Sequence, residues 1–321
     1  MLRHGILAAG NFIVDRVKLI DQYPAQDTLA SILSETPSNG GGPYNLLTDL
    51  AHMRVNYPLH AVGLIGDDPD GQWILDHCRE NSINTDLLVA TPDFSTSYTD
   101  VMTVRSTGRR TFFHQRGANA HFDGSSIDFS KTTARILHLG YLLLLDHLDT
   151  FAADGQTQAA HFLANASSAG LITSLDLVSA EHTQFREIVL SSLPHTDLLF
   201  LNEIEAGKIL GQQVDPKSPQ EIAAAAKTIL SHGVRRTVTL HTEYHAVSAT
   251  ASDETHHQPS LPVPAEKIKG ANGAGDAFAA GFLHAIHEDL TIPQALLIAV
   301  KTAAQCLNHP TPSGGVRPLV E

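Results

Sequence analysis

Short apolar runs alternate with longer amphipathic stretches along most of the chain. Runs rich in Leu, Ile and Val between polar or glycine residues are typical of buried strands. They lie at 5–10, 59–65, 136–145, 171–177, 196–201 and 237–240. The stretches between them predict helices at 70–81, 157–169, 202–210 and 219–232. This alternation predicts an α/β fold, with helices on both faces of a central, mainly parallel sheet.

Two polar, β-branched segments, 17–38 and 96–115, interrupt this alternation because no helix separates their strand-like runs. They predict antiparallel strands that project from the main sheet, and we expect them to pair with each other as a small β-strand lid. The expected division is an α/β core at 1–15, 46–95 and 119–321, and a lid at 16–45 and 96–118.

The strongest candidate site is the heptapeptide G-A-N-G-A-G-D at 270–276, which directly precedes an apolar helix predicted at 277–287. Gly273 and Gly275 remove side chains where an anion would approach the backbone, and a helix N-terminus favours negative charge there. A carboxylate beside an anion site needs another role, and Asp276 fits a general base that takes a proton from a hydroxyl. The alternative is an ordinary helix start, with glycines for close packing and Asp276 as a first-turn acid.

Two common nucleotide-binding motifs are absent from the sequence. The nearest approach to a Walker A motif, at 66–71, is followed by Gln72 and not by Lys and then Ser or Thr. Gly5 and Gly10 lie too far apart for the G-x-G-x-x-G of a dinucleotide-binding fold. A nicotinamide dehydrogenase therefore has only the alternation of strands and helices in its favour.

Short glycine- and acid-containing motifs follow one another along nearly the whole chain. They are G-x-x-x-x-D from Gly10 to Asp15, G-G-G-P-Y-N at 40–45, N-x-x-E from Asn202 to Glu205, and G-A-G-D from Gly273 to Asp276. In this order and spacing they resemble the motifs of the ribokinase-like, or PfkB, family of carbohydrate kinases. The resemblance implies a ribokinase-like fold and ATP-dependent phosphorylation of a primary hydroxyl of a sugar or sugar-like substrate. It also implies that the nucleotide lies in the core and the sugar under the lid.

The resemblance gives the closing motif the catalytic roles. Asp276 would deprotonate the acceptor hydroxyl. The helix N-terminus formed by Gly273, Ala274, Gly275 and Asp276 would be the anion hole for the transferring phosphoryl group.

Asp15, Gly40, Gly41 and Asn45 are the implied sugar-binding residues. A carboxylate accepts hydrogen bonds from two hydroxyls, and an amide both donates and accepts, which suits a polyol. The two glycines would let the backbone approach the sugar ring. The alternative is that Asn45 caps a helix at 46–53 and that Asp15 lies in a turn.

Asn202 and Glu205 are expected to organise Mg²⁺ and the ATP phosphates, partly through water, because Mg²⁺ keeps much of its hydration shell. A compatible alternative makes Asn202 the N-cap of a helix and Glu205 its partner in a capping box. His241 stands where the family has a glycine in the loop beside the nucleotide base, so we expect it at the cofactor site.

Four arginines cluster in the predicted lid, and they are Arg105, Arg109, Arg110 and Arg116. A solvated hairpin is the expectation for the first three. Arg116 precedes the point where the lid should re-enter the core, so we expect it to bind the substrate. Some family members that act on keto sugar acids carry an arginine in this region, which adds a sugar acid to the candidate acceptors.

Gly270 and Ala271 stand where family members usually carry Asp and Thr. In many relatives this region helps to hold a monovalent cation near the anion hole. Both side chains are missing here, so we predict weak or absent dependence on potassium.

Charge and cysteine content narrow the partners. The formal net charge is −13, from 21 Lys and Arg against 34 Asp and Glu, which provides no distributed basic surface for nucleic acid or membrane lipid. The acidic balance does not exclude ATP, because backbone amides, a helix N-terminus and Mg²⁺ supply positive potential locally. No apolar run is long enough to cross a bilayer, and the first residues lack the pattern of a secretory signal. Cys78 and Cys306 form no disulfide framework, so we expect a cytoplasmic protein.

Two further expectations concern metals and partners. The 19 histidines predict no metal site, because His241 and His245 follow a strand and do not share a helix face. Exposed lid strands favour a homodimer formed through the lid.

A rival from another class is a catalytically weak sugar- or nucleotide-binding regulatory protein on the same fold. The changes at Gly270, Ala271 and His241 favour it. Retention of Asp276, Asn202 and Glu205 opposes it, because these are the groups nearest the expected chemistry.

Overall fold

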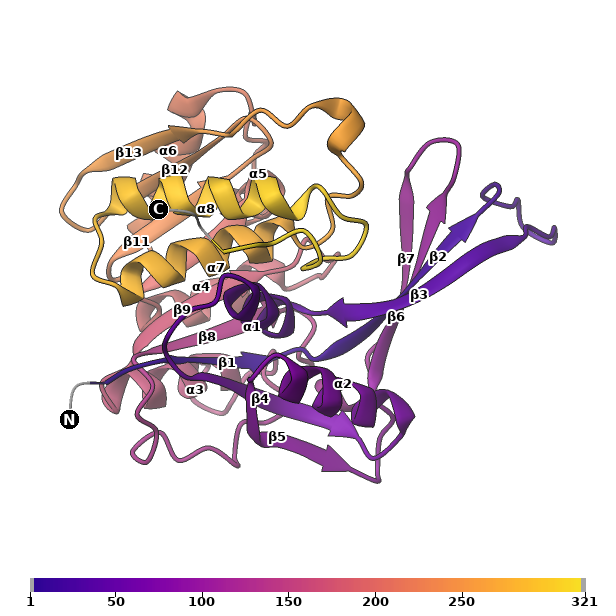
Figure 1. Cartoon of the computed structure of the whole chain (residues 1–321). Coiled ribbons are helices and arrows are strands. Elements are labelled where there is room, and N and C mark those ends of the chain that lie inside the picture. The colour runs from indigo at the N-terminus through magenta and orange to yellow at the C-terminus, as the bar shows by residue number, and fades with distance from the viewer. Residues whose placement is uncertain (1–2, 319–321) are drawn as a thin grey trace.

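The main sheet of the computed structural model, which describes residues 3–318, has nine strands. They are β1 (Ile6–Gly10), β4 (Leu59–Gly66), β5 (Asn84–Thr91), β8 (Ile136–Leu142), β9 (Ile172–Leu177), β10 (Leu198–Asn202), β11 (Thr237–His241), β12 (His245–Thr250) and β13 (Thr255–Pro259). Their order across the sheet is β13-β12-β11-β10-β9-β8-β1-β4-β5 (Figure 1). Every neighbouring pair from β11 to β5 is parallel, whereas β12 and β13 form an antiparallel edge.

The apolar runs predicted the strands from the middle of this sheet and missed β5, β12 and β13. β5 mixes exposed and buried residues at one sheet edge, and β13 at the other edge has the sequence THHQP, so neither forms an apolar run. β8 is shorter than predicted. It ends at Leu142, and Leu143, with φ of 76°, turns the chain out of the sheet.

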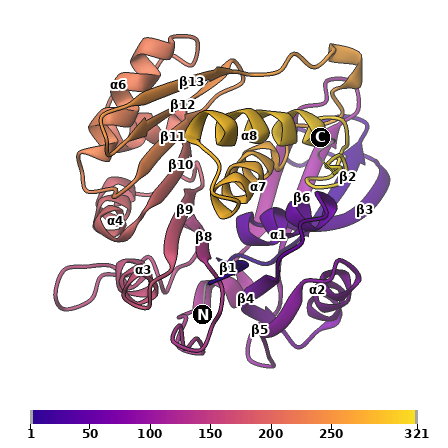
Figure 2. The ribbon, with the colours of Figure 1, turned by 60° about the vertical axis from the view of Figure 1, so that its left-hand side comes forward.

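Helices cover both faces of the main sheet, as predicted (Figure 2). One face carries α1 (Gly42–His52), α2 (Pro69–Glu80), α7 (Ala274–His287) and α8 (Ile292–Cys306). The other carries α3 (Gln158–Ser168), α4 (Phe185–Ser192), α5 (Glu203–Leu210) and α6 (Pro219–Leu230). Alternate strand residues enter the two cores, because Ile6 and Ala8 of β1 pack with the first group of helices while Leu7 and Ala9 pack with the second. The apolar runs did not predict α4 or α8.

A second, small sheet projects from the main sheet (Figure 1). Its strands are β2 (Ile13–Ile20), β3 (Ile32–Gly40), β6 (Ser97–Val104) and β7 (Arg110–Gln115), in the order β3-β2-β6-β7. β2 with β3 and β6 with β7 form antiparallel hairpins, and β2 pairs with β6 in parallel. The expected pairing between the two polar segments is therefore confirmed, with the difference that the strands at their junction run parallel.

Two helices begin earlier than the sequence indicates. α7 begins at Ala274, with Gly273 as its N-cap at a φ of 79°. α1 begins at Gly42, with Gly41 as its N-cap at a φ of 87°. A positive φ favours glycine at both caps, because a Cβ atom is strained there. The alternative in which Asn45 caps α1 is therefore wrong, since Asn45 lies inside the helix.

Shorter elements connect these parts. The 3₁₀ helices are η1 (Gly117–His121), η2 (Leu193–His195) and η3 (Ala265–Lys267). Within residues 3–318, none of the helices has both the length and the apolar character needed to span a membrane.

Candidate active site

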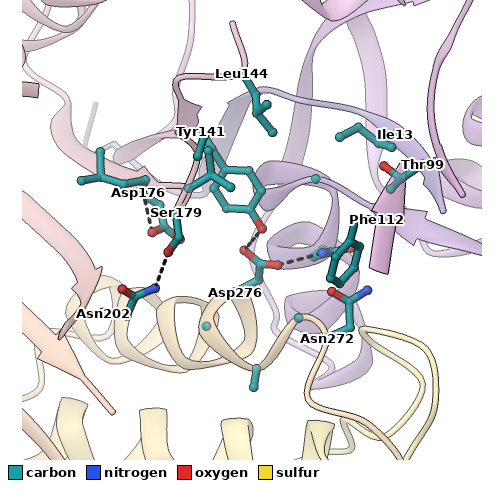
Figure 3. Close-up of a pocket in the computed structure, with 18 of the residues that line it drawn as sticks. Ile13, Thr99, Phe112, Tyr141, Leu144, Asp176, Ser179, Asn202, Asn272 and Asp276 are labelled. Carbon is teal, nitrogen blue, oxygen red and sulfur yellow. Dashed lines mark hydrogen bonds between the residues drawn. The ribbon is translucent and has the colours of Figure 1, made fainter. Parts of the chain in front are cut away.

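A cavity of about 650 Å³ lies between the carboxyl ends of the parallel strands, the small sheet and the start of α7 (Figure 3). The small sheet contributes Ile13, Asp15, Thr99, Phe112 and His114 to its lining. The core contributes Gly41, Asn45, Tyr141, Leu144, Asp176, Leu177, Val178, Ser179, Ala180, Asn202, Glu205, His241 and residues 271–276. Ligands of open α/β sheets bind at this edge. We call this space the first cavity.

Asp276 lies in the first turn of α7 and is buried at the floor of the first cavity. Its Oδ1 accepts a hydrogen bond of 2.6 Å from the Tyr141 hydroxyl, and its Oδ2 accepts one of 2.7 Å from Asn45 Nδ2 (Figure 3). Asn39 Nδ2 donates in turn to Asn45 Oδ1 at 2.7 Å, which fixes the orientation of that amide. The carboxylate is therefore held at both oxygens and points into the cavity.

Several buried acids share this cavity. Burial raises the pKa of Asp276 to about 6, while the hydrogen bonds from Tyr141 and Asn45 act in the opposite direction. Burial also raises the pKa of Asp15 to about 7 and holds that of Asp176 well above its ordinary value, and the nearby Asp276 carboxylate adds to both effects. Carboxylates placed this close together repel, so the cavity favours protons or bound cations.

The backbone at Gly40 lies close to the Asp15 side chain, and the backbone at Gly41 lies close to Asn11. A Cβ atom at Gly40 would lie 2.3 Å from Asp15 Oδ1, and one at Gly41 would lie 2.4 Å from the Asn11 carbonyl oxygen. Asn272 Nδ2 donates a hydrogen bond of 3.1 Å to Asp15 Oδ2. The glycines predicted to contact a sugar thus make room for Asp15 and for the chain around it.

The loop 270–273, which we call the glycine-rich loop, leads directly into α7. Its last residue, Gly273, caps the helix without a side-chain hydrogen bond, and a Cβ atom there would lie 2.5 Å from Pro312 Cβ. The first amide groups of a helix have no carbonyl partner within it and point outward with the positive end of the helix dipole. The amides of Gly275 and Asp276 belong to this turn, so the start of α7 has the geometry of an anion site.

A second cavity of about 730 Å³ lies on the other side of the helix start. It shares with the first cavity Asn202, His241, Ala271, Ala274 and Gly275. Its remaining wall is largely apolar and includes Leu261, Val263, Ile268, Phe278, Val300 and Leu307. The two cavities therefore meet at the first turn of α7. Asp276 lines only the first of them.

Asn202 and Glu205 form the capping box of α5. Asn202 Oδ1 accepts from the amides of Ile204 and Glu205 at 2.9 Å each, and Glu205 Oε2 accepts from the Asn202 amide at 2.9 Å. Ser179 Oγ donates to Glu205 Oε1 at 2.8 Å. The capping interpretation is confirmed, and both residues also line the first cavity.

These contacts decide how the pair could hold Mg²⁺. Direct coordination by Asn202 Oδ1 or by both Glu205 oxygens would compete with the capping hydrogen bonds, whereas water-mediated contact leaves them intact. The donor set thus fits a hydrated Mg²⁺. Within residues 3–318, no three His, Cys, Asp or Glu side chains are grouped as a metal site.

His241 ends β11 and lies between the two cavities. Its ring packs on Phe278 with centroids 5.0 Å apart, and its Cε1 would lie 3.3 Å from a Cβ atom at Gly275. Burial lowers the pKa of His241 to about 4, so the imidazole is neutral at physiological pH. It forms a neutral wall beside the helix start.

The lid arginines are placed differently from the sequence-based expectation. Arg116 forms an ion pair with Asp146 and donates to the Leu143 carbonyl at 3.1 Å, so these partners hold it outside the lining of both cavities. Arg110 is partly buried and not fully solvated. Its guanidinium lies against Gly270, where a Cβ atom would be 2.0 Å from Arg110 Nη2.

Three cavity residues had been given no role from the sequence. Tyr141 lies in β8 with no motif around it, and only the fold brings it to Asp276. Asp176 left a signal, because it is a charged residue inside the predicted buried strand 171–177. Asn272 lies in the glycine-rich loop, and nothing in the sequence indicates its hydrogen bond to Asp15.

Comparison with known proteins identifies relatives over most of the chain. The sequence matches the pfkB family carbohydrate kinase model over residues 7–316. It is 24% identical over 292 residues to a ribokinase of Schizosaccharomyces pombe, covering 88% of this chain and 85% of that protein. It is 26% identical over 292 residues to the probable chloroplastic fructokinase-6 of Arabidopsis thaliana, covering 86% of this chain and 70% of that protein.

Similarity in three dimensions extends further. The fold superposes on the ribokinase of Arabidopsis thaliana, solved with ribose and ATP, with a TM-score of 0.79 and 18% identity. The alignment covers 99% of this chain and 96% of the other. The fold is therefore ribokinase-like. Because the family match spans nearly the whole sequence, the chain belongs to the pfkB family and is a carbohydrate kinase.

Proposed function

We propose that this kinase transfers the terminal phosphoryl group of ATP to a primary hydroxyl of a sugar or sugar-like alcohol. The observation that carries the proposal is the meeting of two cavities at the first turn of α7. An acceptor in the first cavity lies beside Asp276, and ATP in the second cavity directs its phosphates toward the same amides. Ligands of the relatives agree with this assignment, since a structural neighbour was solved with ribose and ATP.

Asp276 is the general base in the proposed mechanism. Its carboxylate accepts the proton of the acceptor hydroxyl while Tyr141 and Asn45 keep both oxygens in place. The amides of Ala274, Gly275 and Asp276, with the capping residue Gly273, stabilise the negative charge of the phosphoryl group in transfer.

Asn202 and Glu205 hold Mg²⁺ through water in this proposal. Bound there, Mg²⁺ would neutralise charge on the ATP phosphates. Its positive charge also offsets the repulsion among the buried carboxylates of Asp15, Asp176 and Asp276. His241 borders the phosphates as a neutral group, which avoids an added charge at the junction of the two cavities.

The acceptor is a neutral polyol bound under the small sheet, which acts as a lid. Asp15 and Asn45 offer hydrogen bonds to its hydroxyls. No Lys or Arg lines the first cavity in the described part of the chain, and Arg116 is held elsewhere by Asp146. These placements favour a neutral sugar over a sugar acid.

Two further properties complete the proposal. The small sheet exposes large apolar side chains, among them Ile32, Leu33 and Phe113, and these support a homodimer formed through the lid. The acidic composition and the free, buried thiols of Cys78 and Cys306 suit the cytoplasm.

A coupled assay of ADP release over a panel of sugars, sugar alcohols, nucleosides and sugar acids tests the function. We expect sustained turnover with at least one neutral sugar-like alcohol, with the phosphate on its primary hydroxyl by NMR. Saturable sugar binding in calorimetry without turnover of any acceptor would instead support the regulatory protein that the changes at Gly270 and Ala271 suggest.

A further inference from the structure

The contact between Arg110 and Gly270 joins the two parts of the molecule that must come together for catalysis. Arg110 is the first residue of β7 in the small sheet, and Gly270 opens the glycine-rich loop of the core. A Cβ atom at Gly270 would lie 2.0 Å from Arg110 Nη2, 3.0 Å from Cζ and 3.2 Å from Nη1. The guanidinium therefore occupies the position of a Cβ atom at residue 270 and would have to shift for a side chain there.

The charge of Arg110 is partly buried. Its Nε is buried and has no hydrogen-bond partner among residues 3–318. Burial lowers the pKa of Arg110, and the nearby thiol of Cys306 and carboxylate of Asp15 oppose that effect. An arginine keeps its proton even when it is buried, so a positive charge is fixed here.

A monovalent cation, which the family resemblance implies for this region, does not fit the residues present. Gly270 and Ala271 supply no side-chain oxygen, and the adjacent space holds a guanidinium. A metal cation placed there would meet a like charge in a poorly solvated position, where repulsion is strong. The absence of a side chain at Gly270 is therefore linked to the presence of the Arg110 guanidinium beside it.

We propose that the Arg110 guanidinium is the resident cation of the glycine-rich loop, in the place that relatives give to a monovalent ion, and that it ties the small sheet to this loop. The inference rests on the proposed function for its catalytic consequence. The charge lies beside the loop that carries the amides of α7, and it arrives there only when β7 is in position. The hydrogen bond from Asn272 to Asp15 joins the same loop to β2.

The first test compares initial rates in sodium, potassium and tetramethylammonium buffers for the unmodified enzyme and for Arg110→Ala. We expect equal rates in all three buffers for the unmodified enzyme. Arg110→Ala should lower kcat by at least about 10-fold, because it removes the positive charge beside the loop that carries the amides of α7. Arg109→Ala is the matched control, because Arg109 is the exposed neighbour in the same hairpin. Strong potassium activation of the unmodified enzyme, or normal kcat for Arg110→Ala, would overturn the proposal.

The second test replaces the Arg110 charge with a carboxylate at position 270 that could bind a monovalent ion. Gly270→Asp alone should lower kcat and the melting temperature, because its Cβ atom would displace the Arg110 guanidinium from its place against the loop. The double variant Arg110→Ala with Gly270→Asp removes the collision and adds a carboxylate. We expect it to recover part of the lost melting temperature and to gain both a rate increase and a rise in melting temperature with potassium over sodium. Additive losses with no potassium response would contradict the pairing of these two positions.

Melting temperatures keep this inference separable from the proposed function. The recovery expected in the double variant depends on contact between positions 110 and 270 and on no substrate. Failure of every acceptor in the turnover assay would thus overturn the kinase proposal and leave the pairing testable. Loss of the recovery would overturn the pairing while turnover stayed intact.

Discussion

The two cavities that meet at the start of α7 differ in what lines them. Both have apolar walls, but the first also contains polar groups that bond to one another, with Asp276 held by Tyr141 and Asn45 and Asp15 held by Asn272. The second is walled mainly by apolar side chains from the strands and loops near β11 and from α7 and α8. Shared backbone at the glycine-rich loop and the first turn of α7 separates them.

This difference implies two kinds of specificity. Directional hydrogen bonds in the first cavity position an acceptor hydroxyl against a base, so changes there should reduce kcat. Apolar surface in the second cavity contributes binding that is the same in the ground state and the transition state. Changes there should therefore raise the KM for ATP and leave kcat nearly unchanged.

The largest expected effect is from Asp276→Asn, which tests whether the first cavity holds the chemistry. The amide keeps the shape of the side chain but cannot take the acceptor proton, so turnover should fall by at least ~10². The dissociation constant for ATP, measured by calorimetry, should change little because Asp276 does not line the second cavity. Near-normal turnover would refute the base assignment.

Asp49→Asn is the matched control for that variant. Asp49 is another buried acid, located on α1, and burial raises its pKa well above the ordinary value. Among residues 3–318 its two carboxyl oxygens have no hydrogen-bond partner, and it lines neither cavity. Turnover of Asp49→Asn should remain close to that of the unmodified enzyme.

Tyr141→Phe should have the next largest effect, because it removes the donor to Asp276 Oδ1 while keeping the ring. A hydrogen bond to a charged group is worth ~1.5–3 kcal/mol, so kcat should fall by about 10- to 150-fold. With the pKa of Asp276 raised to about 6, activity should be lost as pH falls through that value, since only the anionic base accepts a proton.

The pH profile distinguishes positioning from a general loss of structure. The Tyr141 hydrogen bond lowers the pKa of Asp276, so its removal should move the acid limb to higher pH. Asp15 and Asp176 also titrate in the cavity, and the limb is therefore a property of the group of acids. If kcat of Tyr141→Phe falls while the acid limb of its pH–rate profile stays unchanged, Tyr141 acts only through packing.

Glu205→Gln tests the boundary between the two cavities. The amide can accept from only one of the two donors, Ser179 Oγ and the Asn202 amide, that now bond to separate carboxylate oxygens. The Mg²⁺ concentration for half-maximal rate should rise by about 10-fold, the usual effect of losing a metal's outer contacts. Gln294→Ala breaks the other capping box, at Thr291 of α8, and should cost stability without altering the Mg²⁺ dependence.

The ease of prediction from sequence differed between the two cavities as well. The glycine-rich loop and the Asn202 to Glu205 motif are local, because a helix start needs only residues next to one another. Asp276 was therefore recognised from its own surroundings. Its partner Tyr141 was not, since 135 residues separate the two and only the sheet order brings them together.

The same reason explains the error on Arg110. Its sequence neighbours Arg105 and Arg109 are exposed, as a solvated hairpin predicts. What buries Arg110 is the missing side chain of Gly270, a residue on a distant element. The main parallel strands were predictable because burial on both faces makes them apolar, and the edge strands β5 and β13 lack that signature.

The smallest effect is expected for Ala304→Phe, in the apolar wall of the second cavity. The added ring narrows the space beside Val300 and Leu307, so the KM for ATP should rise by several-fold, while kcat and the KM for the acceptor stay near their original values. Steady-state kinetics with each substrate varied in turn measures these changes separately. A large fall in kcat would show that the second cavity also positions the reacting groups, and the contrast between a cavity whose bonded acids set the rate and a cavity that sets affinity for ATP would then fail.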